Sequence, residues 1–205
     1  MASSRHHRLG AVTQAALPEA LRAVELYHRH LPKCTGGLAA FRAESQAGGP
    51  CGWLIVGRAV ARVLDQDGWL EVVRCATIAP KQVHPSIPVS GRHCYGAASA
   101  LYSAAEAWAN GGGQHRPLLT YTLGHESGAS LVAAGWLPCG STSKRPRQWG
   151  CKSRPRKERA AMVAAPKTRW VAPSSVAAAV ARGWTVEGLV NAPFTEPSEL
   201  GAQGR

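Results

Sequence analysis

One stretch, from Trp69 to Trp136, constrains the fold more than any other part of the sequence. It begins with Trp69–Thr77, a run rich in β-branched and apolar residues that predicts a buried strand. This strand carries a carboxylate, Glu71. A proline-rich connection and a glycine-bearing loop over 90–96 then lead into an alanine-rich segment over 97–110, whose apolar residues fall on one helical face. The first half of the stretch is therefore strand, loop and helix.

The second half of the stretch returns to a strand. Leu118–Leu123 predicts a second strand, and Ser127 is placed to cap a short helix through Ala134 that Gly135 ends. Upstream, Pro18 fits the first turn of a helix to about His30. The segments 38–44 and 52–64 predict strands, and Asp67–Gly68 predicts a hairpin turn into the Trp69 strand. The part of the chain before Trp69 therefore predicts a helix followed by antiparallel strands.

The order of these elements resembles the acyl-CoA-binding half of the GNAT acyltransferase superfamily. The pyrophosphate loop of that family begins with Gln or Arg, and here His93, Gly96 and Ala98 occupy its register, with His at the first position. A wider likeness, over about 27–170, is to the phage-encoded Mom-like DNA-modification proteins. It rests on these pieces of sequence: YHRHLPKCTGG (27–37), GWLIVGRAVAR (52–62), LEVVRCAT (70–77), ASALYSAA (98–105), LLTYTL (118–123) and GASLVAAGW (128–136).

The resemblance implies an α/β (α+β) fold with a GNAT-like mixed, mainly antiparallel central sheet flanked by helices and a basic C-terminal extension. It implies a domain over 16–171 that includes a basic segment over 139–171. A loose basic arm over 1–15 would precede it, and a tail over 172–205 with a short helix would follow. It also implies acetyl-CoA, or a related acyl-CoA, as the cofactor. The implied cofactor-binding residues are Val73, Cys75, Arg92, His93, Gly96 and Ala98.

Three residues are candidates for catalysis. Glu71 is costly to bury ionised, so it is either paired with Arg58, Arg62 or Arg74 or has a raised pKa suited to a general base. His28 resembles a histidine of the phage family's active cleft, with a surface histidine at a helix end as the alternative. Tyr121 is a candidate acid to the leaving thiolate and equally a candidate core aromatic.

Composition bounds the partners and the compartment. The formal net charge is +12 and the pI is about 10.1, which predicts attraction to polyanions. The six cysteines form no CxxC pair, so we expect reduced thiols, a cytoplasmic protein and no metal site, although a site from His28, His30, Cys34 and Cys51 is conceivable. In a phage-encoded protein the compartment would be the host-cell cytoplasm. No apolar run approaches the length of a membrane span, so no membrane partner is expected.

The segment over 139–171 is the most basic part of the chain, with ten Lys or Arg against one Glu. Charge runs are usually solvated, but this imbalance favours contact with nucleic-acid phosphates. Trp149 and Trp170 between the cations are typical of a strand edge or a nucleic-acid surface. Tyr27, Trp53 or Trp149 could stack on an extruded base. The candidate nucleic-acid-binding residues are Lys144, Arg145, Arg147, Lys152, Arg154 and Arg156.

The sequence therefore predicts a GNAT-fold acyltransferase that acetylates a base amine in DNA, adenine being favoured through the Mom-like resemblance. One alternative is an acetyl-CoA-dependent N-acetyltransferase of a small amine or a protein. The other is a non-catalytic nucleic-acid-binding protein on a GNAT scaffold. The oligomeric state stays open.

Overall fold

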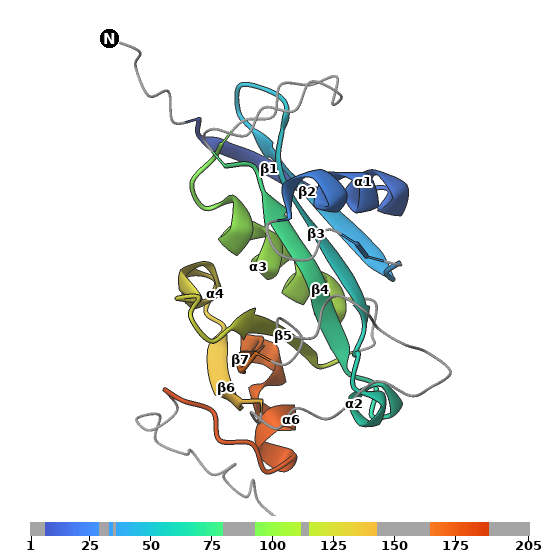
Figure 1. Ribbon diagram of the computed structural model, residues 1–205, viewed down its shortest axis with the longest axis vertical. Helices are drawn as coiled ribbons and strands as arrows, with labels where there is room; N and C mark the ends of the chain where they lie inside the picture. Colours follow the sequence, from blue (N-terminus) through green and yellow to red (C-terminus); the bar gives the residue numbers. More distant parts are fainter. Residues whose placement is uncertain are drawn as a thin grey trace, which may run out of the picture.

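In the computed structural model, the described residues are 7–28, 33–34, 36–79, 93–111, 115–142 and 165–188. They form a seven-stranded sheet in the order β1-β2-β3-β4-β5-β7-β6, with helices on both faces (Figure 1). Neighbouring strands are antiparallel except for β4 and β5, which are parallel. The predicted mixed, mainly antiparallel sheet flanked by helices is confirmed.

The elements have the following bounds. The strands are β1 (Leu9–Gln14), β2 (Ala39–Ser45), β3 (Pro50–Arg58), β4 (Leu70–Thr77), β5 (Leu118–Leu123), β6 (Leu137–Ser141) and β7 (Lys167–Val171). The helices are α1 (Leu17–Tyr27), α2 (Arg62–Gln66), α3 (Ala97–Asn110), α4 (Ala129–Ala133) and α6 (Val176–Ala181), with the 3-10 turn η1 (Pro173–Ser175) before α6.

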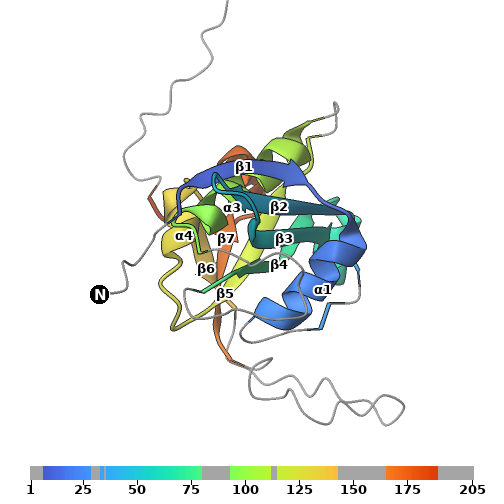
Figure 2. The same ribbon diagram turned by 90° about the horizontal axis from the view of Figure 1, so that it is seen from above.

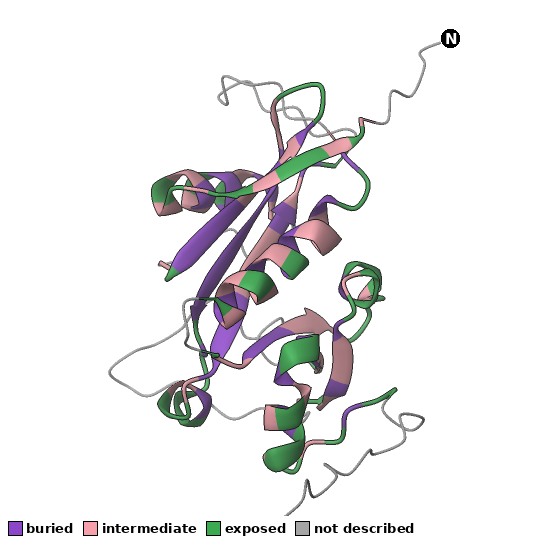
Figure 3. Ribbon diagram, turned by 180° about the vertical axis from the view of Figure 1, so that it is seen from behind, coloured by how far each residue is buried: buried purple, intermediate pink, exposed green. Residues whose placement is uncertain are grey.

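The two faces of the sheet are covered by different helices. Helix α1 packs on one face of β3 and β4, and α3 packs on the opposite face, as the view from above shows (Figure 2). Strand β3 separates them, and its residues from Cys51 to Gly57 are buried because both of its faces are covered (Figure 3). Leu54 and Val56 contact the α3 side, while Trp53 and Ile55 contact the α1 side.

The C-terminal part of the described chain packs beside β5 and β7. Trp184, just after α6, lies 5.0 Å from Trp69 between ring centroids. The Ser175 hydroxyl of η1 accepts a hydrogen bond from the Leu118 N–H at 2.8 Å, and both residues are buried. This segment therefore completes a third apolar cluster with residues of β5 and β7, among them Leu119 and Val171.

Several predicted boundaries were wrong. Residues 9–14, predicted to lie in a loose arm, form β1, because their backbone pairs with β2 although their side chains are mostly exposed. Residues 62–64, predicted as strand, belong to α2. Trp170, predicted for a strand edge or a nucleic-acid surface, is 5% exposed on β7, which lies between β5 and β6 in the sheet, and donates its ring N–H to the Thr122 hydroxyl at 2.9 Å.

Candidate functional site

The site is a cleft between β4 and β5, called here the β4–β5 cleft. The parallel pairing of these strands joins only Leu70 to Leu118 and Glu71 to Leu119. One residue further on, the Thr120 hydroxyl donates to the Val72 carbonyl at 2.9 Å, and the strands then diverge. The divergence opens a cavity of about 760 Å³, within the usual size range of small-molecule sites.

Strand β4 lines this cleft with an open backbone edge. Ile78 donates its backbone N–H to the Cys51 carbonyl of β3 at 3.0 Å. In an antiparallel pair, alternate residues direct their backbone groups to opposite edges. Cys75 and Thr77, which lie opposite Leu54 and Gly52, therefore direct their N–H and C=O groups away from β3 and toward the cleft.

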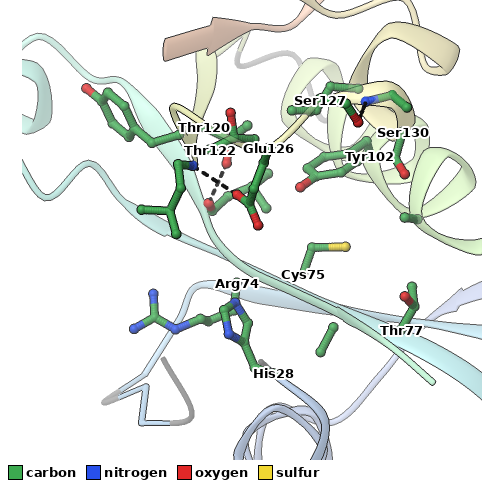
Figure 4. Close-up of a pocket in the computed structure, with 18 of the residues that line it drawn as sticks. His28, Arg74, Cys75, Thr77, Tyr102, Thr120, Thr122, Glu126, Ser127 and Ser130 are labelled. Atoms are coloured by element: carbon green, nitrogen blue, oxygen red, sulfur yellow. Dashed lines mark hydrogen bonds between the residues drawn. The ribbon is translucent and has the colours of Figure 1, made fainter. Parts of the chain in front are cut away.

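The α3 side of the cleft holds Tyr102, which is not among the residues predicted for the site. Tyr102 of α3 and Cys75 of β4 pack in the same cluster, and each side chain shifts the pKa of the other. Burial raises the pKa of Tyr102 well above its ordinary value, and the nearby Glu126 carboxylate acts in the same direction. Burial also raises the pKa of the Cys75 thiol to about 12. Figure 4 shows the side chains of Tyr102, Cys75 and Glu126 turned toward one space. The signal for Tyr102 in the sequence is a hydroxyl on an otherwise apolar helix face.

The opposite side of the cleft, which faces α1, holds Glu71. Its side chain accepts a hydrogen bond from the Val60 N–H at 2.9 Å, and the residue is 9% exposed. Burial raises the pKa of the Glu71 carboxyl, while the Val60 N–H, Lys167 and Arg74 oppose that rise without cancelling it. The direction of this shift agrees with the second of the two alternatives predicted for Glu71.

Tyr121 lies on the same side of the sheet as Glu71, since Leu119 is paired with Glu71 and side chains two residues apart on β5 share a face. Burial first, and the Glu71 charge second, raise the pKa of Tyr121, while the charge of Arg169 opposes them. Tyr121 and Tyr102 thus reach the cleft from opposite faces of the sheet.

The N-terminus of α3 lies at the end of the cleft. Gly96, at the N-cap, has φ of +78°, a left-handed conformation that favours glycine, and its carbonyl accepts the Ser99 hydroxyl at 2.9 Å. The His93 Nδ1 lies 2.9 Å from the Ile78 carbonyl, which can only accept, so this nitrogen carries the proton. His93 and Ala98 both line the cleft. Arg92 lies outside the described residues.

The other predicted residues have different positions. Val73 packs toward α1, and its carbonyl accepts a hydrogen bond from Arg74. His28 is the C-cap of α1 and lines the cleft. Tyr27 and Trp53 stack with ring centroids 5.8 Å apart and are both buried, so neither offers a free face for a base.

The six predicted nucleic-acid-binding residues, with Trp149 and His30, lie outside the described residues. They are Lys144, Arg145, Arg147, Lys152, Arg154 and Arg156. The described residues before and after the segment 143–164 are hydrogen-bonded to each other beside the cleft. Thr142 donates its N–H to the Lys167 carbonyl at 2.8 Å, Lys167 donates its N–H to the Thr142 hydroxyl at 3.1 Å, and Lys167 lines the cleft.

The described residues contain no cluster of three His, Cys, Asp or Glu side chains arranged to hold a metal ion. In the same ranges, no helix has both the length and the apolar character that a bilayer span requires.

Comparisons with known proteins give little beyond this geometry. No family profile matches the chain, and no curated protein matches it. A matching solved structure is described as "a putative phosphinothricin N-acetyltransferase". It shares 14% sequence identity with the chain at a TM-score of 0.46, and the match covers 79% of this chain and 98% of that one.

Proposed function

We propose that the protein is an acyl-CoA-dependent N-acyltransferase whose reaction takes place in the β4–β5 cleft. The observation that carries the proposal is the divergence of two parallel strands. It leaves an open backbone edge at Cys75 and Thr77 on the same strand as a buried carboxylate, Glu71. An extended ligand and a general base would thus share one cavity.

The described residues fit an acyl-CoA. The backbone N–H and C=O groups of Cys75 and Thr77 would bind the amides of its extended pantetheine arm as a further strand binds a sheet edge. The N-terminus of α3, where Gly96 places no Cβ, would face the pyrophosphate, since free helix N–H groups favour anions. When bound, the cofactor would supply a thioester with an electrophilic carbonyl carbon.

Glu71 is the residue we assign to proton removal. An amine that attacks a carbonyl carbon must lose a proton, and a carboxylate with a raised pKa is a better base than an exposed one. Glu71 would take this proton directly or through one water. The Val60 N–H holds the carboxylate in position for either route.

Tyr102, rather than Tyr121, is the hydroxyl that we assign to the leaving sulfur. It lies on the α3 side of the sheet, where the acyl-CoA would enter, and its side chain and the sulfur of Cys75 face the same space (Figure 4). Because its pKa lies well above 10, Tyr102 stays protonated at neutral pH. It would therefore stabilise a departing thiolate by donating a hydrogen bond.

We further propose that the acceptor is a base amine of DNA, with adenine favoured by the Mom-like resemblance. The net charge of +12 supports a polyanionic acceptor. So does the chain position of the segment 143–164, which carries eight Lys or Arg and one Glu and whose flanking residues Thr142 and Lys167 meet beside the cleft. A small amine or a protein amine is the alternative acceptor.

Acyl transfer is tested by following thiol release from acetyl-CoA with a panel of amines. Glu71→Gln keeps the shape and the contact with Val60 but removes the base, so turnover should fall by roughly 10² to 10⁴. Arg182 pairs with Asp67 and does not line the cleft, so Arg182→Met is the control and should turn over normally. Equal turnover of Glu71→Gln and the wild type would refute the assignment of the base.

The DNA acceptor is tested by digesting DNA from cells that express the protein to nucleosides and measuring their masses by mass spectrometry. A modified adenosine is expected with the wild-type protein and not with Glu71→Gln. The result against DNA would be only ordinary nucleosides from the wild type and from Glu71→Gln, while the purified protein transfers the acyl group to a free amine. The acceptor would then be a small amine.

A further inference from the structure

Arg169 of β7 is held directly opposite Tyr121, a residue that lines the β4–β5 cleft. Its Nε donates to the Cys139 carbonyl of β6 at 2.9 Å. Its guanidinium carbon lies 3.5 Å from the centroid of the Trp184 ring, a close cation–π contact. On the neighbouring strand it lies directly opposite Tyr121, and its positive charge opposes the rise in the pKa of that hydroxyl. A planar guanidinium can stack on the Trp184 ring and donate to the carbonyl at once, which a lysine ammonium cannot.

Tyr121 joins this group to the cleft. Its side chain lines the cavity on the same face of the sheet as Glu71 and Lys167, and its charge interaction with Glu71 places the two side chains near each other. It lies on the face of the sheet opposite Tyr102, where we place the thioester sulfur. A hydroxyl beside the general base is placed to contact the incoming amine.

We infer that Tyr121 positions the acceptor amine beside Glu71, and that Arg169, packed between Trp184 and the Cys139 carbonyl, fixes Tyr121 in that position. The inference rests on the proposed acyl transfer and concerns only its acceptor side. It gives the segment 173–186 a part in the site, because Trp184 supplies the surface on which Arg169 rests. The Tyr121 hydroxyl keeps its own proton to donate toward the acceptor.

The test compares Tyr121→Phe, Arg169→Met and the double variant in steady-state kinetics with acetyl-CoA and an accepted amine. Loss of one hydrogen bond to the acceptor should raise the amine KM about five- to tenfold in each single variant. The acetyl-CoA KM should stay at the wild-type value. Because both changes remove the same contact, the double variant should be no worse than the poorer single variant.

The control is Arg182→Met. Arg182 also lies over the Trp184 ring, with its guanidinium carbon 5.7 Å from the centroid, but it pairs with Asp67 and does not line the cleft. It should leave both KM values unchanged. If Arg169→Met does not fold, Arg169→Lys keeps the charge without the planar fork and should still raise the amine KM.

Two kinds of result separate this inference from the proposed function. A normal amine KM in Arg169→Met, or equal rises in both KM values, would overturn the positioning role while leaving acyl transfer intact. A wild-type protein that releases no thiol with any amine would refute the proposed function. If no thiol is released, the Arg169–Tyr121 interaction is tested by a double-mutant cycle of unfolding free energies. Coupled effects of Tyr121→Phe and Arg169→Met would support the interaction, and additive effects would overturn it.

Discussion

Gly128 should be among the least replaceable glycines of the described chain, because Trp170 occupies the space that a side chain would need. A Cβ built on Gly128 would lie 2.2 Å from Cζ2 and 2.7 Å from Cη2 of the Trp170 ring. Real carbon atoms do not approach so closely, so the ring would have to move. Trp170 is buried and tied to Thr122 by a 2.9 Å hydrogen bond, so its movement would also disturb a residue that lines the cleft.

The expected cost of Gly128→Ala has two parts. The residue has φ of +64°, which costs an alanine about 1–2 kcal/mol. Overpacking against a fixed ring adds about 1–3 kcal/mol. The matched control is Gly183→Ala, where φ is +76° but nothing lies within 4 Å of the built Cβ, so only the backbone cost applies.

Urea unfolding followed by circular dichroism would measure both variants. Gly128→Ala should lose about 1–3 kcal/mol more unfolding free energy than Gly183→Ala, with the same dependence on urea. Adding Trp170→Phe, which shortens the ring system, should make the double variant less unstable than the sum of the two single changes. Equal losses in Gly128→Ala and Gly183→Ala would refute the reasoning from the clash.

Three other predictions concern the cleft and its support. Burial raises the pKa of Glu71 in the folded state, so ionising its carboxyl costs stability. Glu71→Gln should therefore be more stable than the wild type at pH 7 in thermal unfolding. This gain should vanish as pH falls below about 4.5, where the carboxyl is protonated in both the folded and unfolded states. Tyr102→Phe should lower kcat by about 10² while leaving the dissociation constant of acetyl-CoA near that of the wild type, measured by calorimetry; an unchanged kcat would contradict its role. Ser175→Ala should cost about 1–3 kcal/mol in urea unfolding, because it leaves the buried Leu118 N–H without its acceptor, and a loss near zero would mean that another group replaces the hydroxyl.

Sequence patterns predicted the central part of the fold because its elements carry their own signals. The helix predicted over 97–110 is α3 with the same bounds, since Gly96 and Asn110–Gly111 mark both of its ends. The apolar run 118–123 is β5. Strand β1 could not be found in this way, because its side chains are mostly exposed and its stability comes from pairing with β2. Strand β7 was not predicted either, because its five residues lie in a basic segment without an apolar strand pattern.

The site could be predicted only in part, for a related reason. Glu71 stood out because a carboxylate within an apolar run is rare, and the structure buries it with a raised pKa. Tyr102 did not, because its spacing along α3 fits a core aromatic, and only the tertiary contact with Cys75 places its hydroxyl in the cleft. The side of the sheet on which Tyr121 lies depended on the register of β5 against β4, which no local pattern fixes.

The most direct test of the central claim is amide hydrogen exchange along β4, resolved by residue, with and without acetyl-CoA. Cys75 and Thr77 direct their N–H groups into the cleft, whereas Ile78 donates to Cys51 of β3. Saturating acetyl-CoA should therefore slow exchange at Cys75 and Thr77 much more than at Ile78, with desulfo-CoA as a non-reacting check on the same amides. Unchanged exchange at Cys75 and Thr77 under saturating acetyl-CoA would contradict binding along this edge and, with it, the proposed acyl transfer in the β4–β5 cleft.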